Sequence, residues 1–445
     1  MFFCLGWGLV GCNTKLGRGR ASATQPPGSS VALAGVPFPG FGNLEGILSL
    51  DLFPDSPSYK DAFVDIEVQK DGKILMAGWG SAPSFADAVV VRTDSNGSLD
   101  PTFGNGTGMF RYERVTGLLD LFHGVELDGD RIVAFGTSFA SRSTSRGEAL
   151  IVALDGNGVL DASFASGGVF LDPIKVGNSS ILSLKINSDR KIVALASAHD
   201  GTGFKYFLIQ LTSDGRYDAT FGQNGVVELD ATVIPHTYGA IRFFGDQIYI
   251  LATLGASRAE KQRLYRVFAA DGTLDSSFGG SGKIDLGDGN RNWGSGLAVN
   301  DLGVYVASNY ESSSVMFHSQ IRMFDHSGVP SSDFGLNGRL DHSSDFIFGS
   351  HIQQLRESAN RIYAVGGRMM SADVTGLDSE YFLDCISPSS GSRVESFGNR
   401  GRIQGASTGV GRSVRAIAID GDVLWAAGHS DYKSGNGVAT LQKLK

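Results

Sequence analysis

The stretch GSLDPTFGNG, residues 97–106, decides the fold because near-copies of it recur along the chain. Clear copies start at Gly158 (GVLDASFASG), Gly215 (GRYDATFGQN) and Gly272 (GTLDSSFGGS). The phenylalanine of the motif recurs every 56 to 63 residues, at Phe41, Phe103, Phe164, Phe221, Phe278, Phe334 and Phe397. Six of these seven copies have a glycine six residues before the phenylalanine. A period of this length is typical of a chain built from repeated structural units.

A second marker with the same period predicts the strands of each unit. The stretch DGKILMAG (71–78) is a turn dipeptide followed by an apolar run, and residues 64–69 before it alternate between apolar and polar. The alternation indicates a strand, and the Asp-Gly turn joins the two strands into a hairpin. A nearly continuous apolar run such as YFLIQL (206–211) predicts a third strand covered on both faces. A fourth strand, such as GVVELD (225–230), follows each phenylalanine motif.

These units predict an all-β protein, with four antiparallel strands in a unit and no helical periodicity anywhere. Residues 41–445 hold seven units of about 58 residues each, which is longer than the rung of a solenoid. An isolated four-stranded sheet leaves both faces exposed, and radial stacking of such sheets covers them. We therefore expect a single seven-bladed β-propeller over residues 41–445. In this fold the phenylalanine motif acts as a joint between adjacent blades.

The repeat unit also resembles a known family. The pattern G-x-L-D-x-[ST]-F-G-x-x-G, followed by strands and a DGKI hairpin, is similar to the delta-60 repeat family of bacterial propeller-forming proteins. The resemblance covers nearly everything after residue 40 and is strongest in the first four copies, since Ser331 and Val394 replace the motif's aspartate in the last clear copies. It implies a propeller in a secreted or surface bacterial protein, and it carries no general catalytic assignment.

The first forty residues predict the cellular address. Residues 1–12 (MFFCLGWGLVGC) are apolar and end in LVGC, which looks like a bacterial lipobox with Cys12 as the lipidated residue, although no Lys or Arg precedes the apolar run. Residues 13–30 (NTKLGRGRASATQPPGSS) are polar and contain Gly, Ser and Pro, and we expect residues 13–40 to form a flexible tether. We expect a lipid-anchored protein of the bacterial cell envelope, on the periplasmic side or at the cell surface. A disordered N-terminus on a cytosolic protein, or another secreted fate, remains the alternative.

Composition excludes several classes of function. A net charge of −8 argues against a nucleic-acid partner, and three cysteines exclude a disulfide framework. No hydrolase, metalloprotease, nucleotide-binding or dinucleotide-binding motif occurs. Asp94 and Asp155 begin stretches reminiscent of calcium loops, but neither stretch carries the bidentate glutamate twelve positions on, so turn formation is the favoured interpretation. We expect no metal and no cofactor.

The two faces of the ring differ in sequence. The turns inside the DGKI-type hairpins and the phenylalanine motifs lie on one face and are alike, whereas the loops predicted on the other face differ in every unit. Binding loops are free to diverge in this way. Aromatic and histidine residues favoured as ligand contacts lie in these variable loops: Trp79, Tyr238, Trp293, Tyr310, His342 and Tyr432.

Two functions of different class follow. The first is a non-catalytic binding or interaction module whose partner, a protein, peptide or glycan, contacts the variable loops. The alternative is a propeller hydrolase or lyase acting on a small lactone or sugar at the central channel. An enzyme requires polar or charged residues at matching positions near the axis. The positions that the repeats share are apolar or glycine, which favours the binding module.

The order of strands in the repeat also predicts how the ring closes. If each blade takes its fourth strand from after the next phenylalanine motif, then the last blade lacks a strand that only Gly46–Leu52 can supply. We expect this N-terminal strand to pair with Val438–Leu444, which also prevents the last strand from being an open edge.

Overall fold

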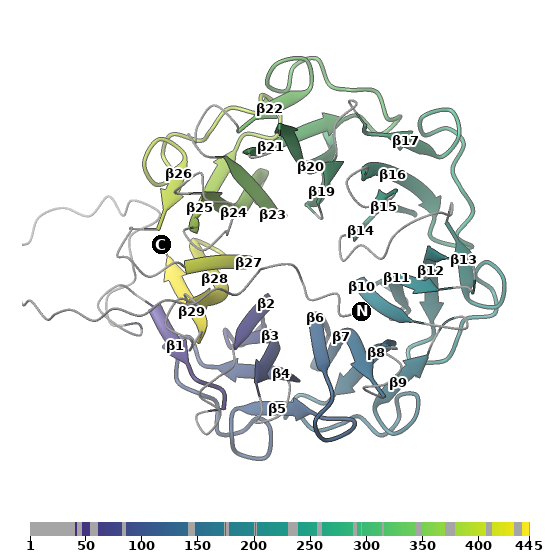
Figure 1. Ribbon diagram of the computed structural model, residues 1–445, viewed down its shortest axis with the longest axis vertical. Helices are drawn as coiled ribbons and strands as arrows, with labels where there is room; N and C mark the ends of the chain where they lie inside the picture. Colours follow the sequence, from purple (N-terminus) through teal and green to yellow (C-terminus); the bar gives the residue numbers. More distant parts are fainter. Residues whose placement is uncertain are drawn as a thin grey trace, which may run out of the picture.

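The described residues of the computed structural model are 41, 47–53, 61–81, 86–140, 147–172, 174, 178–199, 201, 203–229, 239–255, 260–287, 292–294, 296–313, 316–342, 349–369, 379–405, 412–430 and 438–444. They form an all-β ring of seven antiparallel sheets, a seven-bladed β-propeller (Figure 1). The part of the chain that the structure describes contains no helix, and hence no helix that is long and apolar enough to cross a membrane. The predicted anchor at Cys12 and the predicted tether, residues 13–40, lie outside the described residues.

Each blade has four strands in order from the axis to the rim, with a short extra strand in blade 5. The first strands are β2 (Ala62–Val68), β6 (Asp120–Asp128), β10 (Ser179–Ile186), β14 (Gly239–Phe244), β19 (Leu297–Asn300) preceded by β18 (Asn292–Trp293), β23 (Ser350–Ser358) and β27 (Arg412–Asp420). The second strands are β3 (Ile74–Ser81), β7 (Arg131–Phe139), β11 (Ile192–His199), β15 (Gln247–Leu254), β20 (Gly303–Ser313), β24 (Arg361–Met369) and β28 (Val423–Ser430). The third strands are β4 (Ala86–Thr93), β8 (Gly147–Leu154), β12 (Phe204–Leu211), β16 (Lys261–Phe268), β21 (Met316–Phe324), β25 (Ser379–Ile386) and β29 (Ala439–Leu444). The fourth strands, in blades 1 to 7, are β5 (Met109–Tyr112), β9 (Val169–Asp172), β13 (Val226–Glu228), β17 (Lys283–Asp285), β22 (Arg339–Asp341), β26 (Arg402–Gln404) and β1 (Ile47–Leu50).

The ring closes as expected, because blade 7 combines both ends of the propeller. Its strand order is β1-β29-β28-β27, and β1 pairs with β29 in an antiparallel register that sets Ile47 opposite Gln442 and Leu50 opposite Ala439. Every other blade takes its fourth strand from after its own phenylalanine motif, as β5 does after Phe103. The closing strand therefore covers the edge of β29 that would otherwise be open.

The phenylalanine motif joins neighbouring blades, as the repeat predicts. Phe103 is fully buried, and its ring lies under Gly158 of the next motif, where a Cβ would come within 2.5 Å of the ring. The residue after the phenylalanine donates a backbone hydrogen bond to the next motif, as Gly104 N does to Asn157 O at 2.9 Å. Phe41 occupies the same kind of site under Gly97, so the weak seventh copy is a true member of the set. Gly97 is required for two reasons: a Cβ would meet the ring of Phe41, and its φ of 87° is one that other residues rarely adopt.

The first strands carry bulges that the repeat did not reveal. In blades 1, 2, 3, 6 and 7 the register shifts by one residue in the middle of the pairing between first and second strands. In blade 2 the bulged residue is His123, and Gly136 on the second strand lies opposite, where a Cβ would meet the carbonyl oxygen of Leu121 at 2.0 Å. Such bulges re-aim side chains next to the axis.

Candidate functional site

The turns and loops divide between two faces of the ring. We call the face with the turns between first and second strands, and with the phenylalanine motifs, the regular face. The opposite face, with the connections from second to third strands and from fourth strands to the next blade, is the variable face. Asp94 serves the regular face as a turn residue, because its Oδ1 accepts hydrogen bonds from the backbone nitrogens of Asn96 (2.9 Å) and Ser98 (2.8 Å). In the described residues, no three His, Cys, Asp or Glu side chains gather as metal ligands would.

The structure places the predicted ligand contacts at separate points of the variable face. Trp79 lies near the end of β3 in blade 1 and is partly exposed. Trp293 and Tyr310 are both partly exposed and neighbours in blade 5, since Trp293 pairs with Asn309 in the β18–β20 ladder. The ring of Tyr310 stacks on that of His318 with centroids 5.2 Å apart. Tyr238 and Tyr432 lie outside the described residues.

His342 is not at the surface, which corrects its assignment to an exposed loop. Its side chain is fully buried just after β22, and Nδ1 lies 3.5 Å from Oδ2 of Asp384 in the neighbouring blade 6. Asp384 also pairs with Arg402 at 2.5 Å and with Arg393 at 3.1 Å. Burial is the largest single influence and would raise the pKa of the Asp384 carboxyl. The hydrogen bonds and charges of its cationic partners together outweigh burial and hold the pKa below its ordinary value. His342 therefore belongs to a buried polar network between blades 5 and 6.

At the inner part of the variable face, Trp79 contacts Arg415, which in turn acts on side chains of blades 6 and 7. We call Trp79, His351, Gln353, Arg415 and His429 the inner variable-face cluster. The guanidinium carbon of Arg415 lies 5.6 Å from the centre of the Trp79 ring, and Arg415 Nε lies 3.4 Å from Nδ1 of His429. Nε2 of His351 lies 3.0 Å from Nε2 of Gln353. Burial, aided by the charge of Arg415, lowers the pKa of His351 to about 4, so this imidazole is neutral at physiological pH.

Sequence reasoning missed Gln353 and Arg415 of this cluster because of the bulges. Gln353 and Arg415 are the bulged residues of β23 and β27, so simple alternation assigns their side chains to the wrong side. The signal that would have found them is a polar residue at the bulge position of the first strand, which His123 occupies in blade 2. Gly367 provides room for the ring of His351, because a Cβ there would lie 2.5 Å from its Cε1.

A second set of side chains comes from the first strands, one residue from each blade, and we call it the axial ring. Each member is the register partner of a matching residue on the second strand. In blades 1 to 7 these partners are Leu75, Val133, Val193, Tyr249, Tyr305, Tyr363 and Trp425. From blade 1 to blade 7 its members are Glu67, Glu126, Lys185, Arg242, Ala298, Arg356 and Ala418. Five of the seven are charged. The expectation that shared positions near the axis are apolar or glycine is therefore wrong for this position, because five of the seven repeats carry a charge there, of either sign.

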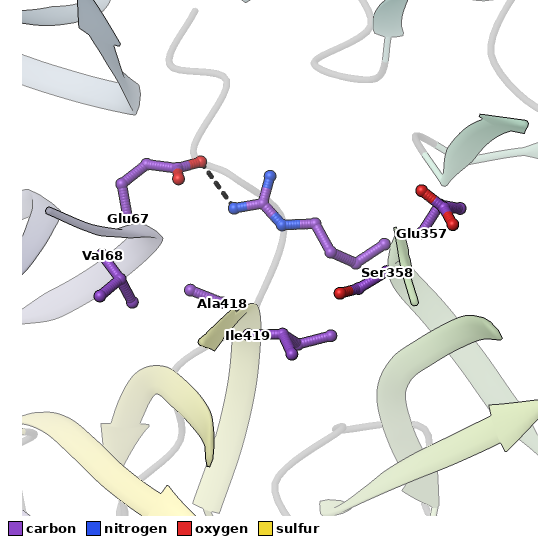
Figure 2. Close-up of a pocket in the computed structure, with 7 residues that line it drawn as sticks. Glu67, Val68, Glu357, Ser358, Ala418 and Ile419 are labelled. Atoms are coloured by element: carbon purple, nitrogen blue, oxygen red, sulfur yellow. Dashed lines mark hydrogen bonds and ion pairs between the residues drawn. The ribbon is translucent and has the colours of Figure 1, made fainter. Parts of the chain in front are cut away.

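The charges of the axial ring are paired between blades. Arg356 Nη2 lies 2.6 Å from Oε1 of Glu67, and the two side chains point toward each other in Figure 2. Lys185 forms an ion pair with Glu126 of the preceding blade. Asp65, two residues before Glu67, accepts a 3.1 Å hydrogen bond from the backbone nitrogen of Val125 in the next blade. Burial and the neighbouring Glu67 raise the pKa of the Asp65 carboxyl.

A cavity of about 230 Å³ lies beside the Glu67–Arg356 pair, toward the regular face. It is lined by Glu67, Val68, Arg356, Glu357, Ser358, Ala418 and Ile419 (Figure 2). These residues come from the first strands of blades 1, 6 and 7. The cavity exists because Ala418 carries no long side chain at its place in the axial ring.

Comparisons with known proteins agree with the fold. Residues 69–103 match the family described as "Domain of unknown function (DUF5122) beta-propeller". Comparison with curated protein sequences found no match. Among solved structures, the polysaccharide lyase Uly1 is similar with a TM-score of 0.52 and 9% identity, over 86% of this chain and 90% of that chain. Drosophila semaphorin 2a is similar with a TM-score of 0.46 and 10% identity, over 89% of this chain and 74% of that chain. At these identities the similarity concerns the fold alone.

Proposed function

We propose that this protein is a non-catalytic binding module of the bacterial cell envelope, and that its partner contacts the variable face. The observation that carries the proposal is the inner variable-face cluster, in which Arg415 of blade 7 contacts the partly exposed Trp79 of blade 1 and acts on His351 of blade 6. Trp and Arg are the side chains that most often dominate binding energy at interfaces. A second pair of aromatic residues, Trp293 and Tyr310, lies at another point of the variable face, in blade 5.

The chemistry of the cluster suits a protein, peptide or glycan partner. Trp79 offers an apolar ring, and Arg415 brings a charge that is stacked on it. His351 stays neutral, so its ring can both donate and accept hydrogen bonds. The regular face is occupied by the joints between blades, which leaves the variable face free to differ from blade to blade.

A pull-down from envelope extract tests the proposal. The intact protein is compared with a variant carrying both Trp79→Ala and Trp293→Ala, and with Leu336→Ala as a matched control. Leu336 is 79% exposed on the regular face, so its truncation removes apolar surface without touching the variable face. We expect the double variant to retain at least tenfold less partner, a loss of about 1.4 kcal/mol or more. Equal capture by the double variant would contradict the proposal.

The envelope location rests on the LVGC sequence at residues 9–12. The change Cys12→Ser should move the protein from the membrane fraction to the soluble fraction, because the thiol is the acylation site in a lipobox. Mass spectrometry of the intact protein should find an acyl group on the wild type alone. A Cys12→Ser protein that stays in the membrane fraction, with no acyl mass on the wild type, would exclude the lipid anchor.

One observation favours the alternative, a hydrolase or lyase acting on a small lactone or sugar. Asp65, Glu67 and Glu126 lie on the first strands of blades 1 and 2, and burial raises the pKa of the Asp65 and Glu126 carboxyls. A raised carboxyl pKa suits a general acid at neutral pH. Hydrolysis of a panel of lactones and glycosides, lost in Glu126→Gln and unchanged in the Trp79→Ala, Trp293→Ala variant, would favour the enzyme. Absence of turnover in the wild type would favour the binding module.

A further inference from the structure

A cavity of about 530 Å³ lies in the joint between blades 3 and 4, at the rim of the regular face. One wall is β13, the outermost strand of blade 3, which contributes Val227 and Glu228 (Figure 1). The other wall is blade 4, which contributes the buried ring of Tyr265 and Leu274 of its phenylalanine motif. Leu274 is 43% exposed, so the cavity is open to solvent on this side. We call it the blade 3–4 cavity.

The preceding joint, between blades 2 and 3, fills the matching place with two aromatic rings. Val227 corresponds to Phe170 of β9, because each is the second residue after the last glycine of its motif. Leu274 corresponds to Tyr217, because each directly precedes the aspartate of its motif. The rings of Phe170 and Tyr217 pack edge-on with centroids 5.7 Å apart, and Phe170 is buried. A joint of this kind therefore accommodates two rings where blades 3 and 4 have aliphatic side chains.

The volume lost at these two positions is not recovered by a closer approach of the blades. The backbone hydrogen bond across the joint is nearly the same in both places. It runs from Ala165 N to Asp214 O at 2.8 Å in one joint, and from Gly222 N to Asp271 O at 2.9 Å in the next. The fourth-strand position of Val227 holds a larger residue in every other blade, since blades 1 to 7 carry Phe110, Phe170, Val227, Ile284, Leu340, Ile403 and Leu48. The space that two rings fill in one joint thus remains as a cavity in the next.

The charged residues that line the blade 3–4 cavity are both acidic, Glu228 and Asp271. Lys205 neutralises Glu228 in part, with Nζ 2.6 Å from Oε1. Hydrogen bonds from the backbone nitrogen and the hydroxyl of Thr273, at 2.9 and 2.8 Å, lower the pKa of the Asp271 carboxyl and keep it ionised. The cavity therefore borders a negative charge, which favours a basic group beside any ring that enters it.

The edge of β13 next to the cavity faces outward. Leu229 N donates to Tyr206 O on the neighbouring third strand at 2.9 Å. Gly225 O accepts from Gln210 N at the same distance, so the odd-numbered residues at β13 form the ladder. In an antiparallel pair the intervening residues direct their backbone groups away from the partner strand. Glu228 therefore presents its N–H and C=O at the rim, where an extended peptide backbone can pair with them.

We propose that the blade 3–4 cavity binds an aromatic side chain of an extended peptide that carries a basic residue next to it. The ring takes the place that Phe170 and Tyr217 fill in the preceding joint, against Tyr265 and Leu274. The peptide backbone pairs with the edge of β13, and Asp271 attracts the basic residue. The site lies at the regular face, so it is independent of the partner proposed for the variable face.

Ligand-observed NMR titration of the whole protein tests the site with three blocked dipeptides, acetyl-Phe-Arg-amide, acetyl-Leu-Arg-amide and acetyl-Phe-Glu-amide. We expect saturable binding of the Phe-Arg probe, at least about threefold tighter than that of the Leu-Arg probe, because ring contacts add affinity beyond buried area. The Phe-Glu probe should bind more weakly than the Phe-Arg probe, and this difference should shrink at high salt. Free p-cresol should also bind more weakly, because it has no backbone to pair with β13.

A variant that fills the cavity separates binding in the cavity from binding elsewhere. The change Val227→Phe installs the side chain of the preceding joint and should abolish binding of the Phe-Arg probe. Its melting temperature should equal or exceed that of the wild type, because the new ring occupies existing space. Ile284→Phe is the matched control, since it makes the same kind of change in the next joint and should leave binding unchanged.

Several results would overturn the proposal. Absence of saturable binding of the Phe-Arg probe, or equal binding of the Leu-Arg probe, would remove the aromatic site, and equal binding of the Phe-Glu probe would refute the role of the basic residue. Unchanged binding by Val227→Phe, or a melting temperature well below that of the wild type, would show that a ring does not fit the cavity. Equal binding of p-cresol would assign the cavity to a free aromatic molecule. Self-association of the wild type that Val227→Phe abolishes, measured by analytical ultracentrifugation, would assign it to a second copy of this chain.

Discussion

Closure of the ring by its N-terminal segment gives a prediction with a definite size. Phe41 is 2% exposed, its ring packs edge-on against Trp425 with centroids 5.5 Å apart, and Gly97 lies against its other side. Truncation of a buried phenylalanine to alanine typically costs about 3–5 kcal/mol, because transfer energy is lost and a cavity remains. We therefore expect Phe41→Ala to lower the free energy of unfolding by about 3–5 kcal/mol.

Deletion of residues 1–52 should cost more than this single change. The hydrogen bonds between β1 and β29 contribute about 1 kcal/mol each, and the entropy lost on ordering the four residues of β1 largely offsets them. The cost of the deletion in free energy of unfolding therefore comes mainly from the buried side chains that it removes. Ile47 is 4% exposed and adds about 1.5–3 kcal/mol to the loss of Phe41, so the deletion should cost about 4–8 kcal/mol.

Urea unfolding followed by tryptophan fluorescence measures both effects, and Trp425 reports directly on the Phe41 contact. Phe221→Ala is the matched control, because Phe221 is equally buried in a joint away from the closure and should lose a similar free energy without a change in the Trp425 environment. Leu336→Ala should change the free energy of unfolding by less than about 0.5 kcal/mol. A deletion of residues 1–52 that costs less than Phe41→Ala would refute the reasoning, since β1 would then contribute nothing.

Three further predictions concern single features of the fold. Ser49→Cys with Thr440→Cys should form a disulfide visible on a non-reducing gel, because these residues are register partners in the β1–β29 pair; no crosslink would disprove the register. Gly136→Ala should destabilise the protein by several kcal/mol in urea unfolding, since the new Cβ meets the Leu121 carbonyl; a change below about 1 kcal/mol would show that the bulge can relax. Ion pairs and hydrogen bonds outweigh burial and lower the pKa of Asp100 to about 2, so its stabilising effect is complete above its ordinary pKa of 3.8 and is lost as the pH falls toward 2. Asp100→Asn should therefore lose less stability than the wild type between pH 5 and pH 2, and parallel curves would contradict the assigned shift.

The sequence predicted the ring, its blade number and its closure because these depend on local features that repeat at fixed spacing. The buried Phe103 and the glycine at 158 are required by close packing and by backbone geometry, so the clear copies of the motif keep both residue types. The turn at Asp71-Gly72 is kept in shape but not in sequence, since Ala359 and Asn360 take positive φ values at the corresponding turn of blade 6. The axial ring escaped notice because its members share neither a residue type nor the sign of their charge. Glu126 pairs with Lys185 of the next blade, so opposite residues occupy matching positions.

The candidate binding surface was only partly predictable, for a different reason. Trp79 was found because an exposed aromatic residue next to a variable loop is unusual, but its contact with Arg415 joins blades 1 and 7, which are far apart in sequence. The same holds for His342, whose burial depends on Asp384 of the next blade. Contacts between blades cannot be derived from the period alone, since the period describes what the units share and these contacts depend on how they differ.

The loss of the motif's aspartate in the last clear copies accompanies a change in the side chains around it. In blade 1, Arg92 lies 2.8 Å from Asp100 and covers the ring of Phe103 at 4.6 Å. In every clear copy the residue at the aspartate position donates its backbone nitrogen to the third-strand residue, including Ser331 to Met323 and Val394 to Cys385. The third-strand partners, in blades 1 to 6, are Arg92, Ala153, Gln210, Arg266, Met323 and Cys385. The backbone bond is thus constant, whereas the aspartate is kept in the four copies where a polar side chain reaches it. That side chain is Arg92, Gln210 or Arg266 on the third strand, and in blade 2, where the third strand has Ala153, it is Arg131 of the second strand, whose Nη1 lies 3.9 Å from Asp161. The third-strand partners Met323 and Cys385 cannot pair with a carboxylate in this way, and a buried carboxylate without a partner is costly. The repeat therefore changes in sequence toward the C-terminus while the backbone bond of the joint is maintained.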